Sequence, residues 1–189
     1  VQNCDVEIAN IDESFLEELM NRLGVYDVVN LSFGYRRIDE APLSRTDYEV
    51  LQSQGMTLSD YTRVFDERER LYKKIFASHP ETFFVVAAGN GVPMSFLGSV
   101  GVPIGGQYKV YPAVFEYENL ITVTAINDSA FDFNKPKTYS IPPYANYSSD
   151  FVDVAAPVEI NEEGTSFAAP YVSRLADEIK QEHRSKIKA

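Results

Sequence analysis

The sequence predicts an α/β protein in three layers (α/β/α), with a mostly parallel β-sheet between two layers of helices. Short apolar runs rich in β-branched residues recur along the chain, as is typical of buried parallel strands. Longer segments between them place apolar residues at helical spacing. Because the two kinds of segment alternate, each strand is expected to be followed by a helix that covers the sheet.

The first part of the chain predicts a β-α-β unit. Residues 6–11 (VEIANI) are expected to form a strand, and Asp12 is placed to cap the N-terminus of a helix over residues 13–23. Gly24 stands where a helix C-cap belongs. Residues 27–33 (DVVNLSF) form the next predicted strand.

The middle of the chain predicts one long helix and one buried strand. Residues 35–59 are polar and are expected to be irregular. Residues 60–78 carry one apolar stripe and one highly charged face, which predicts a helix at the surface. Residues 82–88 (TFFVVAA) predict a strand that ends just before Gly89 and Asn90.

The last part of the chain adds two strands and a final helix. Residues 120–126 (LITVTAI) alternate as a strand does, and residues 151–155 are expected to form a shorter one. A helix is predicted from Thr165 to about residue 181, with Pro170 tolerated in its first turn. The residues predicted to share its apolar face are Phe167, Ala168, Tyr171, Val172, Leu175, Ala176 and Ile179. No repeat or linker divides the chain, so residues 1–189 are predicted to form one domain.

Charge and composition exclude several classes of function. The chain has 17 Lys+Arg against 28 Asp+Glu, a net charge of −11. This balance argues against binding nucleic acid or an anionic membrane surface, both of which need clustered positive charge. No apolar stretch is long enough to span a bilayer. The single cysteine, Cys4, rules out an internal disulfide and is expected to be a bystander.

A serine stands at the start of the predicted final helix. Gly164 lets the backbone turn sharply before Thr165 and Ser166. Backbone N–H groups in the first turn of a helix lack partners, so they favour negative charge that develops beside Ser166. A serine at such a position is also an ordinary helix cap, so this feature alone does not establish a nucleophile.

Two strand ends supply further polar or open positions. Asn90 follows an apolar strand, and ligands of parallel sheets gather at the carboxyl ends of strands. Its carboxamide is placed to donate to an oxyanion, although a simple turn residue is the alternative. The strand over residues 27–33 ends at Gly34, where a peptide backbone can approach closely, or where the glycine merely terminates the strand.

Taken together, these segments resemble the subtilisin-like (S8) family of serine peptidases. Residues 164–170 (GTSFAAP) resemble the GTS-x-A-x-P motif that carries the family's nucleophile, and residues 85–90 (VVAAGN) resemble its oxyanion-asparagine strand. Residues 28–34 (VVNLSFG) resemble the strand whose end lines the primary specificity pocket. The resemblance covers residues 28–175 and is interrupted by a family-atypical insertion at residues 35–81, which holds the charged helix.

The resemblance implies a serine endopeptidase that acts on polypeptide substrates. Ser166 would attack the scissile carbonyl, while the Asn90 amide and the Ser166 backbone N–H would hold the oxyanion. The residues implied to bind substrate are Ser32, Phe33, Gly34, Ala88 and Gly89. The substrate backbone would add as a strand along the edge formed by residues 32–34. No cofactor is implied; structural calcium is common in the family, but no ligand set can be mapped here.

The family's catalytic aspartate and histidine motifs are both missing from the chain. The only histidines, His79 and His183, stand in a helix end and a basic tail, where they are not expected to act as the base. In the family, the aspartate-bearing strand lies between the strands that residues 6–11 and 28–33 resemble. We therefore expect a second chain or an N-terminal segment to supply both groups, and this chain alone to be inactive.

Two other interpretations compete with the peptidase. In a non-catalytic relative, the scaffold would survive as a peptide-binding or interaction module, with Ser166 as a helix cap. A generic α/β hydrolase fits poorly, because Ser166 does not stand in a Gly-x-Ser-x-Gly elbow. Composition leaves the compartment open, and the family resemblance favours a secreted or periplasmic location.

Overall fold

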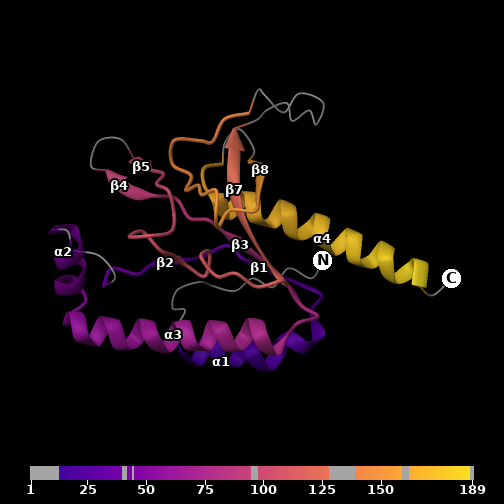
Figure 1. Ribbon diagram of the computed structural model, residues 1–189, viewed down its shortest axis with the longest axis horizontal. Coiled ribbons are helices and arrows are strands. Elements are labelled where there is room, and N and C mark those ends of the chain that lie inside the picture. Colours follow the sequence, from indigo (N-terminus) through magenta and orange to yellow (C-terminus); the bar gives the residue numbers. More distant parts are fainter. Residues whose placement is uncertain are drawn as a thin grey trace.

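Four parallel strands form the central sheet of the computed structural model (Figure 1). The structure describes residues 13–39, 42–43, 45–94, 98–127, 139–158 and 162–187. The strands of the sheet, in spatial order, are β1 (Val28–Leu31), β3 (Phe83–Ala87), β7 (Leu120–Asn127) and β8 (Val154–Val158). The predicted parallel sheet is confirmed, whereas the strand predicted at residues 6–11 and its neighbour Asp12 lie outside the described residues.

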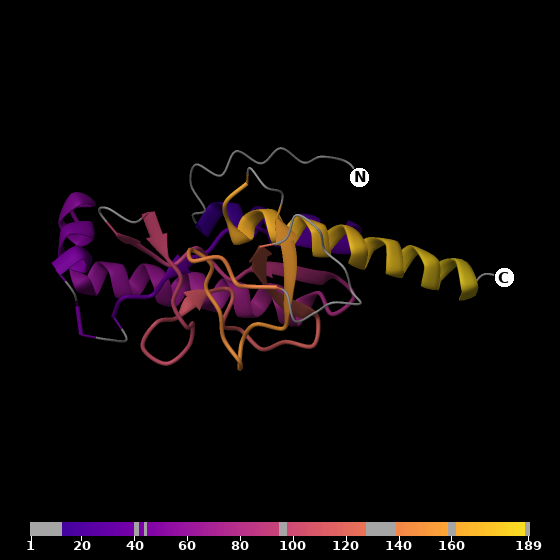
Figure 2. The same cartoon turned by 90° about the horizontal axis from the view of Figure 1, so that it is seen from above.

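Helices cover both faces of this sheet (Figures 1 and 2). One face packs against α4 (Thr165–Ile187), and the other packs against α1 (Glu13–Arg22) and α3 (Leu58–Ser78). Successive residues of β3 point to opposite faces, so Phe84 and Val86 join one core while Val85 and Ala87 join the other. The three-layer prediction is confirmed. No described helix has the length and hydrophobicity needed to cross a membrane.

Two small antiparallel pairs lie beside the main sheet. The first pairs β2 (Tyr35–Arg36) with β6 (Val110–Tyr111), and the second pairs β4 (Val92–Met94) with β5 (Gly98–Val100). Because β2 follows β1 after a short connection, β6 is brought next to the carboxyl ends of the central strands.

The prediction that residues 35–59 are irregular is wrong in part. They contain β2 and a nine-residue helix, α2 (Arg45–Ser53), whose Leu51 packs in a small core with Tyr61 and Phe65. The long helix begins at Leu58 because Thr57 caps it. The Thr57 hydroxyl accepts from the Asp60 N–H, and the Asp60 carboxylate accepts from the Thr57 N–H.

Three predicted boundaries are also corrected. Gly24 does not cap a helix with a left-handed residue; it lies within a 3₁₀ turn, η1 (Leu23–Val25), and its φ is not positive. The strand predicted at residues 151–155 is β8, which starts at Val154 because the Asp153 carboxylate accepts instead from the Thr122 N–H at 2.7 Å. The final helix continues six residues beyond residue 181, to Ile187.

The apolar face predicted for α4 divides into two stripes. Ala168 of that face is buried against the sheet, together with Ala169, which was not among the residues predicted to share it. The larger residues Phe167, Tyr171, Leu175 and Ile179 keep between 44% and 60% of their surface exposed. Helical spacing groups both sets, but only small side chains let the helix approach the sheet closely at this crossing.

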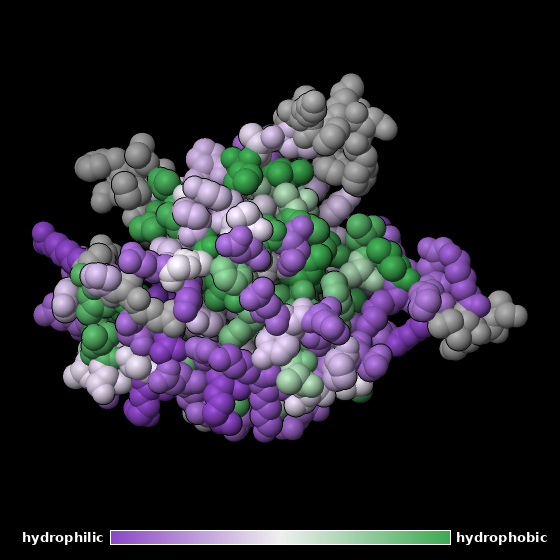
Figure 3. Space-filling model, viewed as in Figure 1, coloured by the Kyte–Doolittle hydropathy of each residue, from purple (hydrophilic) through white to green (hydrophobic). Residues whose placement is uncertain are grey.

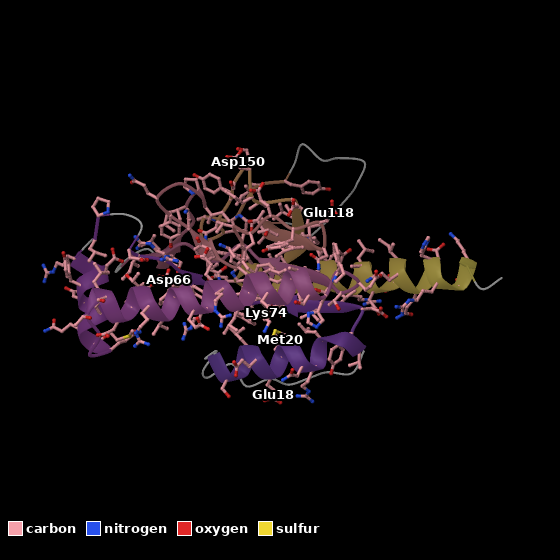
Figure 4. All side chains as sticks on the ribbon, turned by 60° about the horizontal axis from the view of Figure 1, so that its bottom comes forward. Glu18, Met20, Asp66, Lys74, Glu118 and Asp150 are labelled. Carbon is pink, nitrogen blue, oxygen red and sulfur yellow. The ribbon has the colours of Figure 1, made fainter. Side chains whose placement is uncertain are left out.

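The long helix α3 presents polar residues to solvent. Hydrophilic residues gather along the bottom of the molecule in Figure 3, where α3 lies in Figure 1. Asp66 and Lys74 lie on α3 in Figure 4, and Met20 of α1 lies between the two helices and packs against the core. The charged face of α3 is thus a solvated surface over part of its length.

Arg37 ties α3 to the segment that follows β2. Its Nε donates to Asp39 at 2.9 Å, its Nη1 to Glu69 at 2.7 Å and its Nη2 to Asp66. The Arg37 side chain is only 10% exposed and that of Asp39 only 9%. Burial is the largest single influence on the pKa of the Asp39 carboxyl and raises it. The hydrogen bonds from Arg37, a backbone N–H and Thr62, together with the charge of Arg37, outweigh burial and lower that pKa.

Arg37→Ala is expected to lower the free energy of unfolding by about 1–3 kcal/mol, because it leaves Asp39 buried without this cation. Asp66→Asn is the control, since Asp66 is 59% exposed and its pair should contribute less than about 1 kcal/mol. The pKa of Asp39 is lower in the folded state, so the deficit of the Arg37 variant should be complete above about pH 4 and shrink at more acidic pH. Urea unfolding of the unmodified protein and the two variants, at pH values above and below about 4, measures this loss of unfolding free energy. A loss in the Arg37 variant that grows on acidification would contradict the proposed Arg37–Asp39 interaction.

Candidate active site

Ser166 lies in the first turn of α4 and is partly exposed. Gly164, just before the helix, has a φ of +143°, a conformation that residues with a side chain rarely adopt. The Phe167 N–H donates to the Gly164 carbonyl at 3.1 Å, which closes the turn into the helix. The glycine therefore sets the angle at which the serine leaves the loop.

Pro170 is not in the first turn of the observed helix, contrary to the prediction. A proline has no N–H to donate to the carbonyl four residues earlier, which here belongs to Ser166. The Ser32 hydroxyl supplies that hydrogen bond instead, at 2.9 Å. This contact joins the end of β1 to the residue that carries the candidate nucleophile.

Asn90 is exposed just beyond the end of β3, and α4 fixes the orientation of its carboxamide. Asn90 Oδ1 accepts from the Thr165 N–H at 2.8 Å and from the Thr165 hydroxyl at 3.1 Å. The same hydroxyl accepts from the Gly89 N–H at 3.0 Å. Because the oxygen end of the amide is engaged by two donors, the nitrogen end points away from Thr165.

The Ser166 hydroxyl and the Asn90 amide converge on one point. A β-carbon built on Gly164 would lie 3.0 Å from Ser166 Oγ and 3.3 Å from Asn90 Nδ2. The absence of a side chain at Gly164 leaves this point open. A reacting carbonyl group placed there would meet both an oxygen nucleophile and an amide donor.

The residues predicted to bind substrate differ in how far they are exposed to solvent. Ser32 and Phe33 are half-buried and Gly34 is exposed, and a β-carbon on Gly34 would lie 3.1 Å from the Tyr111 carbonyl oxygen. Gly89 is half-buried with a φ of +91°. Ala88 is completely buried; its N–H donates to Val123 and its carbonyl accepts from Asn146.

Sequence reasoning missed Asn146, which supports the loop that carries Asn90. Its side chain is 1% exposed; Nδ2 donates to the Ala88 carbonyl at 2.9 Å, and Oδ1 accepts from the Val102 N–H at 3.0 Å. Its backbone N–H donates to the Gly89 carbonyl at 3.0 Å. The only local signal was a glycosylation sequon, and burial makes this asparagine inaccessible to a glycan in the folded protein.

Neither histidine lies near Ser166. His183 is exposed on α4, 17 residues and about 25 Å along the helix from the serine. His79 ends α3, ahead of the amino end of β3, whereas Asn90 follows its carboxyl end. Among the described residues, no cluster of three or more His, Cys, Asp or Glu is arranged to hold a metal ion.

A three-layer parallel sheet with a serine opening one helix and an asparagine ending the neighbouring strand is the architecture of subtilisin-like α/β proteins. A model of the subtilase family matches residues 10–188. The chain therefore belongs to the subtilase family. A search of curated proteins finds no significant match.

This chain is similar to several solved structures, and two of them with TM-scores above 0.5 share its fold. The epidermin leader peptide processing serine protease (EpiP) of Staphylococcus aureus, as its S393A mutant, is similar with a TM-score of 0.52 and 20% identity over 90% of this chain. The structure of the unmutated enzyme has a TM-score of 0.51 and 20% identity over 90% of this chain. MycP1 with its N-terminal propeptide removed has 18% identity over 87% of this chain, with a TM-score of 0.43. The chain covers 44% of the EpiP chain and 53% of the MycP1 chain, so it spans about half the length of these structures or less.

Proposed function

We propose that this chain is the nucleophile-bearing part of a serine endopeptidase of the subtilisin type. The observation that carries the proposal is the shared point at Gly164, which lies within 3.3 Å of both Ser166 Oγ and Asn90 Nδ2. Membership of the subtilase family supports the same chemistry. The substrate is a polypeptide, which adds as a strand along residues 32–34.

Ser166 Oγ attacks the carbonyl carbon of the substrate, forming a carbon–oxygen bond and an oxyanion. The Asn90 amide and the backbone N–H of Ser166 at the start of α4 donate to that oxyanion. The serine proton passes to a general base and then to the leaving amine as the peptide C–N bond breaks. Thr165 contributes by holding the oxygen of the Asn90 amide, so that the nitrogen faces the reaction.

The base and its orienting acid come from an N-terminal segment or from a second chain. Among the described residues, β1 is an edge strand of the main sheet, and an edge strand is open to pairing with another strand. Without that polypeptide the chain is inactive. The reaction requires no cofactor, and the family favours a secreted or periplasmic location.

A non-catalytic peptide-binding or interaction module is the second candidate. The observation that favours it is the distance of both histidines from Ser166. In this case Ser166 would serve only in the first turn of α4, and the edge at residues 32–34 would bind peptides without cleaving them.

A fluorophosphonate probe separates the two candidates. We expect it to label Ser166 slowly or not at all in the 189-residue chain, and rapidly in a longer form of the protein that supplies the aspartate and histidine. Ser166→Ala in the longer form is the control and should remove the label. Labelling in neither form would reject the peptidase and favour the binding module.

A further inference from the structure

One methyl group lies close to two of the glycines predicted to line the substrate site. A β-carbon built on Gly34 would lie 3.1 Å from Val110 Cγ1. A β-carbon built on Gly89 would lie 3.4 Å from the same Val110 methyl. The ends of β1 and β3 therefore face a single valine, which is 5% exposed.

Val110 is held rigidly in this place. It belongs to β6, where it pairs with Arg36 of β2, and its carbonyl accepts from the Val114 N–H at 3.0 Å. The neighbouring Lys109 carbonyl accepts from the Arg37 N–H at 3.1 Å. A β-branched side chain has few rotamers, and this one packs in the main core. The methyl cannot move aside without disturbing that packing.

We propose that Val110 closes the specificity pocket, so that the enzyme accepts only a small residue, glycine or alanine, immediately before the scissile bond. This inference rests on the proposed function, because Gly34 and Gly89 border a substrate pocket only if the chain binds peptides at this edge. Even a single carbon added to either glycine comes within 3.4 Å of Val110 Cγ1. An aromatic or long aliphatic side chain entering the gap would overlap the valine.

The wall of the pocket suits an uncharged occupant. Gly34 and Gly89 offer no side chain, and the polar groups beside them carry no charge. The Tyr111 carbonyl oxygen lies 3.1 Å from the β-carbon built on Gly34, and Asn146 Nδ2 lies 2.8 Å from the one built on Gly89. The groups around this point are therefore small and uncharged, so we expect discrimination by size. Each extra methylene on a substrate side chain that does not fit such a site changes selectivity by roughly 10–200-fold.

Product peptides test this assignment without requiring catalysis. Two tetrapeptides, identical except for a C-terminal alanine or phenylalanine, are titrated into the 189-residue chain. Binding is followed by NMR through the side-chain amide of Asn90, which the terminal carboxylate would contact. We expect the alanine peptide to bind at least about ten-fold more tightly than the phenylalanine peptide.

Two substitutions of Val110 should move this preference in opposite directions. Val110→Ala removes both methyl groups and should bring the two dissociation constants within about three-fold of each other. Val110→Ile adds a carbon and should weaken the alanine peptide while sparing a glycine-terminated one. Melting temperatures show whether each variant is folded, and the isoleucine variant tests the idea even if the alanine variant is unstable.

The outcomes separate this inference from the proposed function. Equal binding of both peptides by the unmodified chain, or an unchanged preference in both variants, would overturn the role of Val110 and leave the peptidase in place. If neither peptide perturbs the Asn90 amide of the unmodified chain, the substrate site itself is wrong and both proposals fail.

Discussion

Gly164→Ala is expected to reduce the reactivity of Ser166 by more than about 10³-fold, the upper end of the loss caused by removing one oxyanion donor. The new methyl group would lie 3.0 Å from Ser166 Oγ and 3.3 Å from Asn90 Nδ2. It would thus occupy the point at which the proposed mechanism places the substrate carbonyl. The measurements are the rate of labelling by a fluorophosphonate and kcat/KM for peptide cleavage, both in the form of the protein that carries the base.

A second effect of this substitution has to be separated from the first. Alanine at a φ of +143° is strained by about 1–3 kcal/mol, so the variant will also be less stable. Gly55→Ala is the matched control, because Gly55 has a positive φ of +63° and no atom near its built β-carbon. We expect it to lose stability and keep full reactivity. Normal labelling of a folded Gly164 variant would show that the carbonyl does not bind at this point.

Sequence patterns predicted the central sheet well because its strands are buried on both faces. A run such as FFVVA in β3 has no polar position, and the chain must turn at the glycine that follows. α2 was missed because most of its nine residues are polar, so the segment resembles an irregular surface stretch, although Leu51 packs in the small core. In α4 the spacing predicted a helix correctly, but it could not show that Ala168 rather than Phe167 faces the sheet.

The candidate site was predictable only where it depends on the ends of elements. Ser166 opens a helix and Asn90 follows a strand, and parallel topology places such ends at one edge of the sheet. Asn146 and Val110 stand in loops or short strands, and their roles arise from contacts with residues far away in the sequence. No local pattern encodes such contacts, so only the folded structure shows them.

In the proposed mechanism Asn90 donates to the oxyanion, so Asn90→Ala is expected to lower kcat by about 10²–10³-fold, the known cost of losing the oxyanion asparagine in subtilisin, with little change in KM. The amide donates to the oxyanion only after the carbonyl has been attacked, so its loss affects the transition state more than substrate binding. The substitution also removes the acceptor for the Thr165 N–H and hydroxyl, which should cost about 0.5–2 kcal/mol of stability, as the loss of a helix cap does.

Asn90→Asp distinguishes the catalytic role of this residue from its structural one. Aspartate keeps an oxygen to accept from Thr165, and a negative charge near the N-terminus of α4 is favourable, so stability should match that of the unmodified protein. The other carboxylate oxygen would replace Nδ2 and face the developing oxyanion, where it repels charge instead of donating a hydrogen bond. Turnover should therefore fall at least as far as in Asn90→Ala, although the fold is better preserved. If Asn90→Asp instead keeps normal turnover while Asn90→Ala loses it, the residue acts only by capping α4, and the oxyanion must be stabilised by other groups.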